Sequence, residues 1–217
     1  MIKTQEKFNF YSHLLGMIAA VIGTVFLVKE AVGSASLIAT ALIYGLSLVF
    51  LFSASSLYHA FKTKENELSF WRRMDRLAIF FMIAGSYTPV CYFFLDDDWR
   101  LPMIAIQWGL VGFGFLTQLF FPRAPRIIYA MIFLTMGWML AIPMEQVLNA
   151  MTSVQSHLLI IGGIAFSAGA IFYALKRPLI IPGIFSFHEL FHVMVLIGGG
   201  CHYALIYSAF AFTGEQL

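Results

Sequence analysis

Long apolar stretches separated by short polar connectors repeat along the whole 217-residue chain. A helix that crosses the hydrocarbon core of a bilayer needs about 20 mostly apolar residues, and seven stretches reach that length. We therefore predict an all-α fold in which a single seven-helix transmembrane domain fills residues 1–217. The predicted spans are approximately 10–29, 36–60, 74–95, 102–121, 127–148, 157–175 and 187–211.

The composition agrees with a polytopic membrane protein and excludes an ordinary soluble domain. Hydrophobic residues make up 60% of the chain and charged residues 11%, and the mean hydropathy is +0.84. The first apolar stretch is long enough to stay in the bilayer, so we expect no cleaved signal peptide. The two cysteines, Cys91 and Cys201, lie apart inside apolar stretches, so we expect small core residues and no disulfide.

The basic residues of the connectors predict the orientation. If the helices alternate in direction, 11 of the 13 Lys and Arg residues fall on one side of the membrane. Cytoplasmic loops carry the excess of Lys and Arg, so we expect a cytoplasmic N-terminus and an external C-terminus. Topology alone explains these charges, and no nucleic-acid partner is indicated. The 11 residues are Lys3, Lys7, Lys62, Lys64, Arg72, Arg73, Arg76, Arg123, Arg126, Lys176 and Arg177.

Two prolines lie within predicted spans, Pro89 in the third and Pro143 in the fifth. A proline removes one hydrogen bond from a helix, but neighbouring helices can satisfy the freed carbonyl. We therefore expect a kink at each proline rather than a break.

Three histidines at the predicted cytoplasmic ends of the spans are candidate metal ligands. His59 closes the second span, and His188 and His192 occupy the first turns of the seventh. Residues four apart share one helix face, so His188 and His192 can bind the same ion. Three imidazoles and one open position are typical of catalytic Zn²⁺ sites, although nickel, copper and iron also accept imidazole.

Asp75 and Ser55 are candidates for the accompanying chemistry. Asp75 opens the third span and could orient a metal-bound water or act as general base. Ser55 lies one turn from His59 on the same face and could hydrogen-bond to the water or to a developing oxyanion. The plainer alternatives are an ion pair of Asp75 with Arg72 or Arg76, and an ordinary interhelical hydroxyl at Ser55.

Three further polar residues, Glu6, Asn9 and His13, come before or at the start of the first span. We interpret them as a shell or lid around the metal site, with Asn9 as a helix cap and Glu6 paired with basic connector residues. In an alternative interpretation His13 supplies a fourth metal ligand.

The remaining ionisable residues of the sixth and seventh spans have simpler interpretations. Glu189 faces away from His188 and is expected to extend to the lipid headgroups. His202 lies roughly 15 Å deeper than His192 by helix rise, too far to share its metal, and could line a cavity. His157, at the outer end of the sixth span, is expected at the interface.

The order of these motifs resembles the hemolysin III proteins of bacteria, which belong with the adiponectin and progestin receptors. The resemblance covers nearly all 217 residues, and the joint occurrence of the motifs is more specific than any one of them. In chain order, the motifs are Glu6-x-x-Asn9-x-x-x-His13, Ser55-x-x-x-His59, Asp75-Arg76 and His188-x-x-x-His192.

The resemblance implies a seven-helix protein of the bacterial cytoplasmic membrane, with zinc near the cytoplasmic face. His59, His188 and His192 would hold the zinc, and Asp75 would hold a water on it. The pattern is more distantly similar to alkaline ceramidases, which implies hydrolysis of a lipid amide. We expect membrane lipids as partners and no protein hormone, because the chain lacks an extracellular domain and the receptors' long N-terminal segment.

Three functions stay open from the sequence. The first is a zinc-dependent hydrolase of a lipid amide within the membrane. The second is a sensor or regulator of membrane state with a structural zinc. The third is a cytolytic, haemolytic pore, which is less favoured because the polar cluster is confined to one leaflet.

Overall fold

The computed structural model describes residues 6–64, 67–181 and 185–214, and side chains as far as residue 212. Lys3, one of the predicted cytoplasmic basic residues, lies outside the described residues. The helical elements are α1 (Lys7–Glu30), α2 (Ala35–Phe61), α3 (Phe70–Phe94), α4 (Asp97–Phe120), α5 (Arg126–Trp138), η2 (Met139–Ala141), α6 (Met144–Ala150), α7 (Ser153–Leu175) and α8 (Phe187–Gly214).

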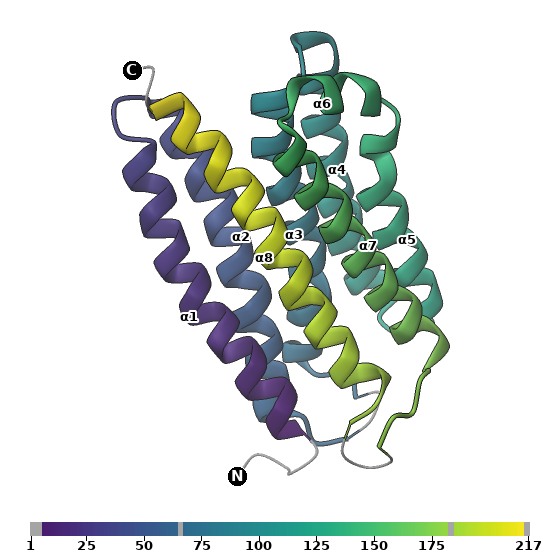
Figure 1. The fold of residues 1–217 in the computed structure, drawn as a ribbon. Helices are drawn as coiled ribbons and strands as arrows, with labels where there is room; N and C mark the ends of the chain where they lie inside the picture. The colour runs from purple at the N-terminus through teal and green to yellow at the C-terminus, as the bar shows by residue number, and fades with distance from the viewer. Residues whose placement is uncertain (1–5, 65–66, 182–184, 215–217) are drawn as a thin grey trace.

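The long helices run alternately up and down in one bundle, so the two ends of the chain lie at opposite ends of the molecule (Figure 1). Six helices of the described chain are long and apolar enough to cross a membrane, and α5 with α6 makes a seventh candidate if the bent pair is one span. The chain is thus an all-α, multi-pass membrane protein. The alternation brings the N-terminus and the α2–α3, α4–α5 and α7–α8 connectors to one end, called here the N-terminal end.

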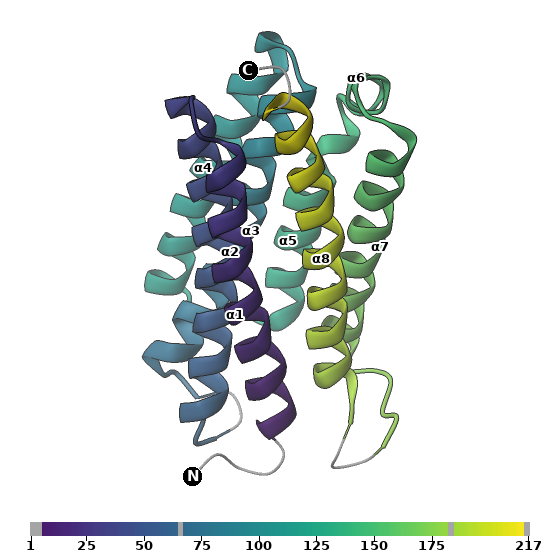
Figure 2. The ribbon, with the colours of Figure 1, turned by 60° about the vertical axis from the view of Figure 1, so that its left-hand side comes forward.

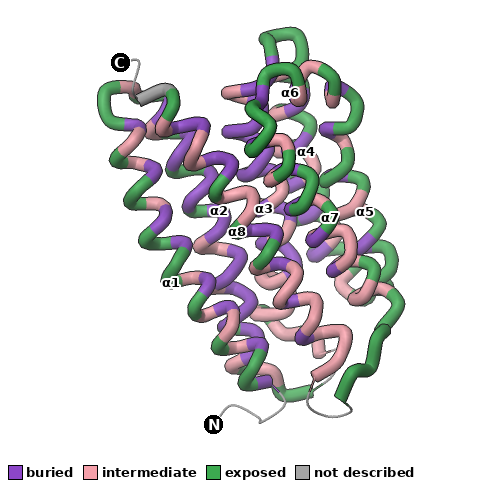
Figure 3. The backbone as a smooth tube through the Cα atoms, in the orientation of Figure 1, coloured by how far each residue is buried: buried purple, intermediate pink, exposed green. Residues whose placement is uncertain are grey.

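The bundle has an enclosed centre and an apolar exterior. In the most apolar 18-residue stretch of α3, 72% of the residues are buried, compared with 22% in α7. α3 is more buried because α2, α4, α5 and α8 contact it. α8 packs against α1 and α7, and these neighbours lie side by side in both ribbon views (Figure 2). Exposed backbone positions face outward along α1, α5 and α7 (Figure 3), and many carry large apolar side chains that suit contact with lipid.

The fifth span differs from the predicted continuous helix. α5 ends at Trp138, a short 3₁₀ turn follows, and α6 begins after Pro143 at an angle of 62° to the helical stretch Arg126–Ala141. The expected kink at Pro143 is therefore wrong, because the helix breaks before the proline. Pro89, in contrast, stays inside α3 without ending it, as expected.

Side chains of neighbouring helices stabilise this break. The Tyr87 hydroxyl of α3 donates to the carbonyl of Gly137 (2.8 Å) and accepts from the amide of Leu140 (2.9 Å). Gln107 of α4 donates from Nε2 to the carbonyl of Met136 (2.9 Å). Irregular backbone at membrane depth persists where such buried partners satisfy its polar groups, and the sequence does not reveal these partners.

Candidate metal centre and adjoining cavity

The three predicted ligand histidines meet at the N-terminal end of the bundle. α2 brings His59 down in its last turns, and α8 begins beside it with His188 and His192. One ring nitrogen of each lies within 4.8 Å of those of the others. The Nε2 atoms of His59 and His188 are 3.3 Å apart. The folded chain therefore joins ligands that are 129 residues apart in sequence.

This arrangement suits a metal ion. Two nitrogens bound tetrahedrally at about 2.0–2.1 Å lie about 3.3 Å from each other, which matches the separation between His59 and His188. His59 and His192 are each 1% exposed, and Nδ1 of His192 has no hydrogen-bond partner in the described chain. The cluster could hold a metal ion, and imidazole donors suit zinc and other transition metals better than magnesium or calcium.

Glu6 supports the cluster from the start of α1. Its Oε2 lies 2.6 Å from Nδ1 of His59, and its Oε1 accepts a hydrogen bond from Nζ of Lys62 at 2.7 Å. Burial by itself raises the pKa of Glu6, but the hydrogen bonds and charges of His59 and Lys62 outweigh it and lower the pKa to about 2. The ionised carboxylate favours the proton on Nδ1 of His59, which leaves Nε2 free to bind a metal.

Asn9 and Glu189 join α1 to α8 beside the cluster. Asn9 donates from Nδ2 to Oε1 of Glu189 (2.9 Å), and Ser186 donates to Oε2 from its amide and its hydroxyl (2.8 and 2.7 Å). Asn9 is thus not the expected helix cap, since Glu6 occupies the N-cap position of α1. Glu189 is only 7% exposed, so the expectation that it reaches the headgroups is wrong: hydrogen bonds from α1 and the α8 entry satisfy it in the interior.

His13 lies against the cluster without being part of it. Its ring is 3.9 Å from that of His192, centroid to centroid, with an interplanar angle of 31°. His13 is 2% exposed, and neither ring nitrogen has a hydrogen-bond partner among the described residues. The ion-binding group contains His59, His188 and His192, so the structure does not favour His13 as a fourth ligand.

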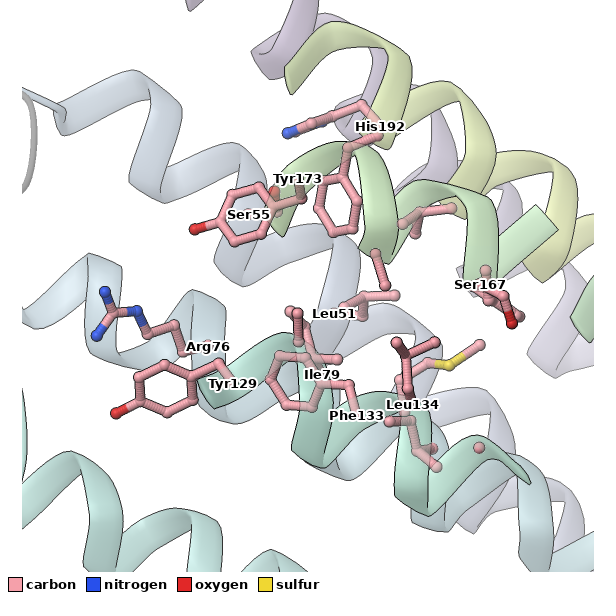
Figure 4. Close-up of a pocket in the computed structure, with 18 of the residues that line it drawn as sticks. Leu51, Ser55, Arg76, Ile79, Tyr129, Phe133, Leu134, Ser167, Tyr173 and His192 are labelled. Carbon is pink, nitrogen blue, oxygen red and sulfur yellow. The ribbon is translucent and has the colours of Figure 1, made fainter. Parts of the chain in front are cut away.

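A cavity of about 630 Å³ begins at the cluster and extends between the helices. Ser55, Asp75, His188 and His192 are among its lining residues, and Ser55 and His192 face it in Figure 4. Ser55 is a hydrogen-bond partner of the Asp75 carboxylate, so the structure brings the two candidate catalytic residues together. His202 also lines the cavity, as expected.

Two arginines in the cavity wall escaped the sequence analysis as site residues. Arg126 was interpreted only as a marker of topology, and Arg76 also as a possible ion-pair partner of Asp75, yet both line the cavity. Nothing in a single sequence separates an arginine that faces a cavity from one that faces the membrane surface, because both occur at helix ends.

Comparisons with known proteins find a family and several relatives that match most of the chain. The family model described as "Haemolysin-III related" matches residues 1–203. The "Hemolysin-3 homolog" of Bacillus subtilis is 30% identical over 196 residues, 89% of each chain. The human "Monocyte to macrophage differentiation factor" is 27% identical, over 92% of this chain and 82% of its own. The yeast (Saccharomyces cerevisiae) "ADIPOR-like receptor IZH2" is 26% identical, over 91% of this chain and 69% of its own.

Proposed function

We propose that this chain, which belongs to the haemolysin III-related family, is a zinc-dependent membrane hydrolase that cleaves the amide bond of a lipid. The observation that carries the proposal is the buried cluster of His59, His188 and His192, backed by the Glu6 carboxylate and opening on a cavity of about 630 Å³. Cavities of about 300–1,000 Å³ are typical of small-molecule sites.

The chemistry divides between the metal and two side chains. His59, His188 and His192 would hold the zinc, which would polarise a carbonyl and lower the pKa of a bound water towards about 7. Asp75 orients the attacking water, accepts its proton and returns that proton to the leaving amine. Ser55, the hydrogen-bond partner of Asp75, donates its single hydroxyl hydrogen to that carboxylate. Once Asp75 has taken the proton of the water, the hydroxyl turns and donates to the oxygen on which negative charge develops.

The orientation and location are part of the proposal. The N-terminal end of the bundle carries most of the basic connector residues, and the positive-inside rule places that end in the cytoplasm. The relatives include bacterial proteins, which supports the bacterial cytoplasmic membrane. The metal site then lies on the cytoplasmic side, and the substrate comes from the membrane lipids.

The test compares metal content and turnover in three variants of the detergent-purified protein. Wild type is expected to hold about one zinc by mass spectrometry and to release fatty acid from ceramide or another lipid amide. His188→Ala should lose both properties. Asp75→Asn should keep the zinc and lose turnover by about 10²–10⁴-fold, the usual contribution of general acid–base catalysis. His157→Gln, which changes an exposed histidine far from the cluster, is the control.

Two results would count against the hydrolase. Full turnover in zinc-loaded Asp75→Asn would contradict the role of Asp75, and a zinc-loaded wild type inactive on ceramides and other lipid amides would favour the sensor with a structural metal. The relatives named hemolysins also make cytolysis an alternative. Dye release from protein-containing vesicles without lipid cleavage would favour that alternative.

A further inference from the structure

The lining of the cavity changes character along its length. Basic side chains gather at the N-terminal end of the bundle, whereas apolar side chains such as Leu134, Leu159 and Phe166 line the part farther from it. This division fits an amphiphile, with its polar head near the metal cluster and its apolar tail between the helices. The basic lining residues are Lys62, Arg72, Arg76, Arg126 and Lys176.

Arg76 is buried there in contact with a backbone carbonyl and an aromatic ring. It is 8% exposed, its NH1 donates to the carbonyl of Pro122 at 3.1 Å, and its guanidinium carbon lies 4.7 Å from the ring centroid of Tyr129. Asp75 attracts it electrostatically, but no carboxylate of the described chain lies within ion-pair distance of Arg76. A buried guanidinium without a carboxylate partner is costly, and a bound anion would offset that cost.

Arg126 approaches the same region from the first residue of α5. Its guanidinium carbon lies 5.1 Å from the ring centroid of Tyr173 and 5.8 Å from that of Phe187. Arg126 forms no salt bridge with any residue that the structure describes. Tyr173 also interacts electrostatically with Arg76, so it is a neighbour of both arginines. In Figure 4, the polar ends of Arg76, Tyr129 and Tyr173 point towards the same side of the cavity.

Membrane topology alone does not account for this placement. An arginine that only marks the cytoplasmic side extends to the headgroups and stays exposed. Arg123, in the same α4–α5 connector as Pro122, is exposed and is absent from the lining residues. Arg76 is buried instead, and arginine is the side chain best suited to bind phosphate and carboxylate through paired hydrogen bonds.

We propose that Arg76 and Arg126 form a binding site for the anionic head, a carboxylate or phosphate, of an N-acylated lipid whose acyl chain occupies the apolar part of the cavity. The aromatic faces of Tyr129 and Tyr173 hold the guanidinium groups in place. The site deepens the proposed function by naming the charge of the lipid amide, and it rests on that function because the two share one cavity.

Direct binding tests the site without reference to turnover. The probes are N-oleoylglycine and N-oleoylethanolamine, which share an acyl chain and an amide but differ in that only the first is an anion. N-acetylglycine and inorganic phosphate are the anions without a long chain. Affinities are measured by isothermal titration in a neutral detergent at pH 7, with zinc-loaded and with chelator-treated protein, so that binding of the carboxylate to the metal is separated from binding to the arginines.

Wild type should bind N-oleoylglycine at least about tenfold more tightly than N-oleoylethanolamine, with or without zinc, as expected for charge-assisted hydrogen bonds. The preference should vanish in Arg76→Gln/Arg126→Gln. It should persist in Arg123→Gln, and largely persist in Arg76→Lys/Arg126→Lys, which keeps both charges. The lysine variant also shows whether loss in the glutamine variant comes from charge rather than misfolding.

Three results would overturn the site. The first is equal affinity of wild type for the two oleoyl probes, and the second is a preference for N-oleoylglycine that survives in Arg76→Gln/Arg126→Gln. The third is binding of the short anions as tightly as N-oleoylglycine, which would indicate a site for free anions. An arginine-dependent preference in a protein that hydrolyses no lipid amide would retain the binding site and reject the hydrolase.

Discussion

Glu6 connects the metal-binding end of α2 to the start of α1 through a single carboxylate. One oxygen contacts His59 and the other accepts from Lys62, so the carboxylate both orients the imidazole and neutralises the lysine. A carboxylate behind a ligand histidine raises its basicity and fixes its tautomer. At the residue scale, this contact is the one we expect to govern metal affinity.

Glu6→Gln should weaken zinc binding by about 10–100-fold, the usual cost of losing such a contact. A competition titration with a chromophoric chelator measures the affinity. Glu30→Gln is the matched control, because Glu30 ends the same helix at the other end of the bundle and accepts from Tyr207 at 3.2 Å. Unchanged affinity in Glu6→Gln would show that the contact with His59 does not support the metal site.

Glu67 organises the connector between α2 and α3 in a pH-dependent way. Its Oε2 accepts hydrogen bonds from the amides of Thr63 and Lys64 (3.0 and 3.2 Å), and its Oε1 from the hydroxyl of Ser69 (2.9 Å). Burial by itself raises its pKa, but the hydrogen bonds from Thr63, Ser69 and Lys64 together outweigh it and lower the pKa from 4.5 to about 2. Because its pKa is lower in the folded chain than in the unfolded chain, the ionised Glu67 carboxylate stabilises the connector above about pH 4.5. This stabilisation is lost as the pH falls towards 2 and the carboxylate is protonated.

Amide hydrogen exchange measures this loss. Protection factors of the Thr63 and Lys64 amides, corrected for the intrinsic rate, should fall in wild type between pH 5.5 and pH 2.5. In Glu67→Gln they should be low at both values and change little. A wild-type protection that is the same at both pH values would contradict the role of the ionised carboxylate.

The break between α5 and α6 depends on contacts between elements. Tyr87→Phe removes a hydroxyl that serves both the Gly137 carbonyl and the Leu140 amide, and leaves two polar backbone groups without that partner. We expect a loss of about 1–3 kcal/mol in unfolding free energy, measured by denaturant unfolding in detergent. Tyr92→Phe, in the same helix, removes a hydroxyl that bonds to exposed Ser36 and should cost less than about 0.5 kcal/mol. Equal effects of the two variants would contradict a specific role for Tyr87.

At the scale of the whole molecule, the histidine cluster connects the second helix to the last. A metal bound by His59 of α2 and by His188 and His192 of α8 binds only the folded arrangement, so it stabilises the bundle through mass action. Free zinc at 100 times its Kd should add about 2.7 kcal/mol to the stability of wild type. The unfolding temperature should fall on chelation and recover with zinc, and His59→Ala should show no response. An equal response in His59→Ala would place the stabilising metal elsewhere.

The sequence by itself determined the membrane class and the approximate helices, because the free energy of placing an apolar stretch in lipid depends on that stretch alone. It also indicated His59, His188 and His192, since residue type and helix spacing are local properties. Their approach to one another is confirmed, whereas the roles of Asp75 and Ser55 stay predictions.

Only the tertiary structure decided which polar groups satisfy one another. The partners of Glu189, the contact between the rings of His13 and His192, the break before Pro143 and the burial of Arg76 all depend on side chains from other helices. A buried polar group is stable only beside a suitable partner, and helix packing selects that partner from distant parts of the chain. No local pattern in the sequence contains that choice.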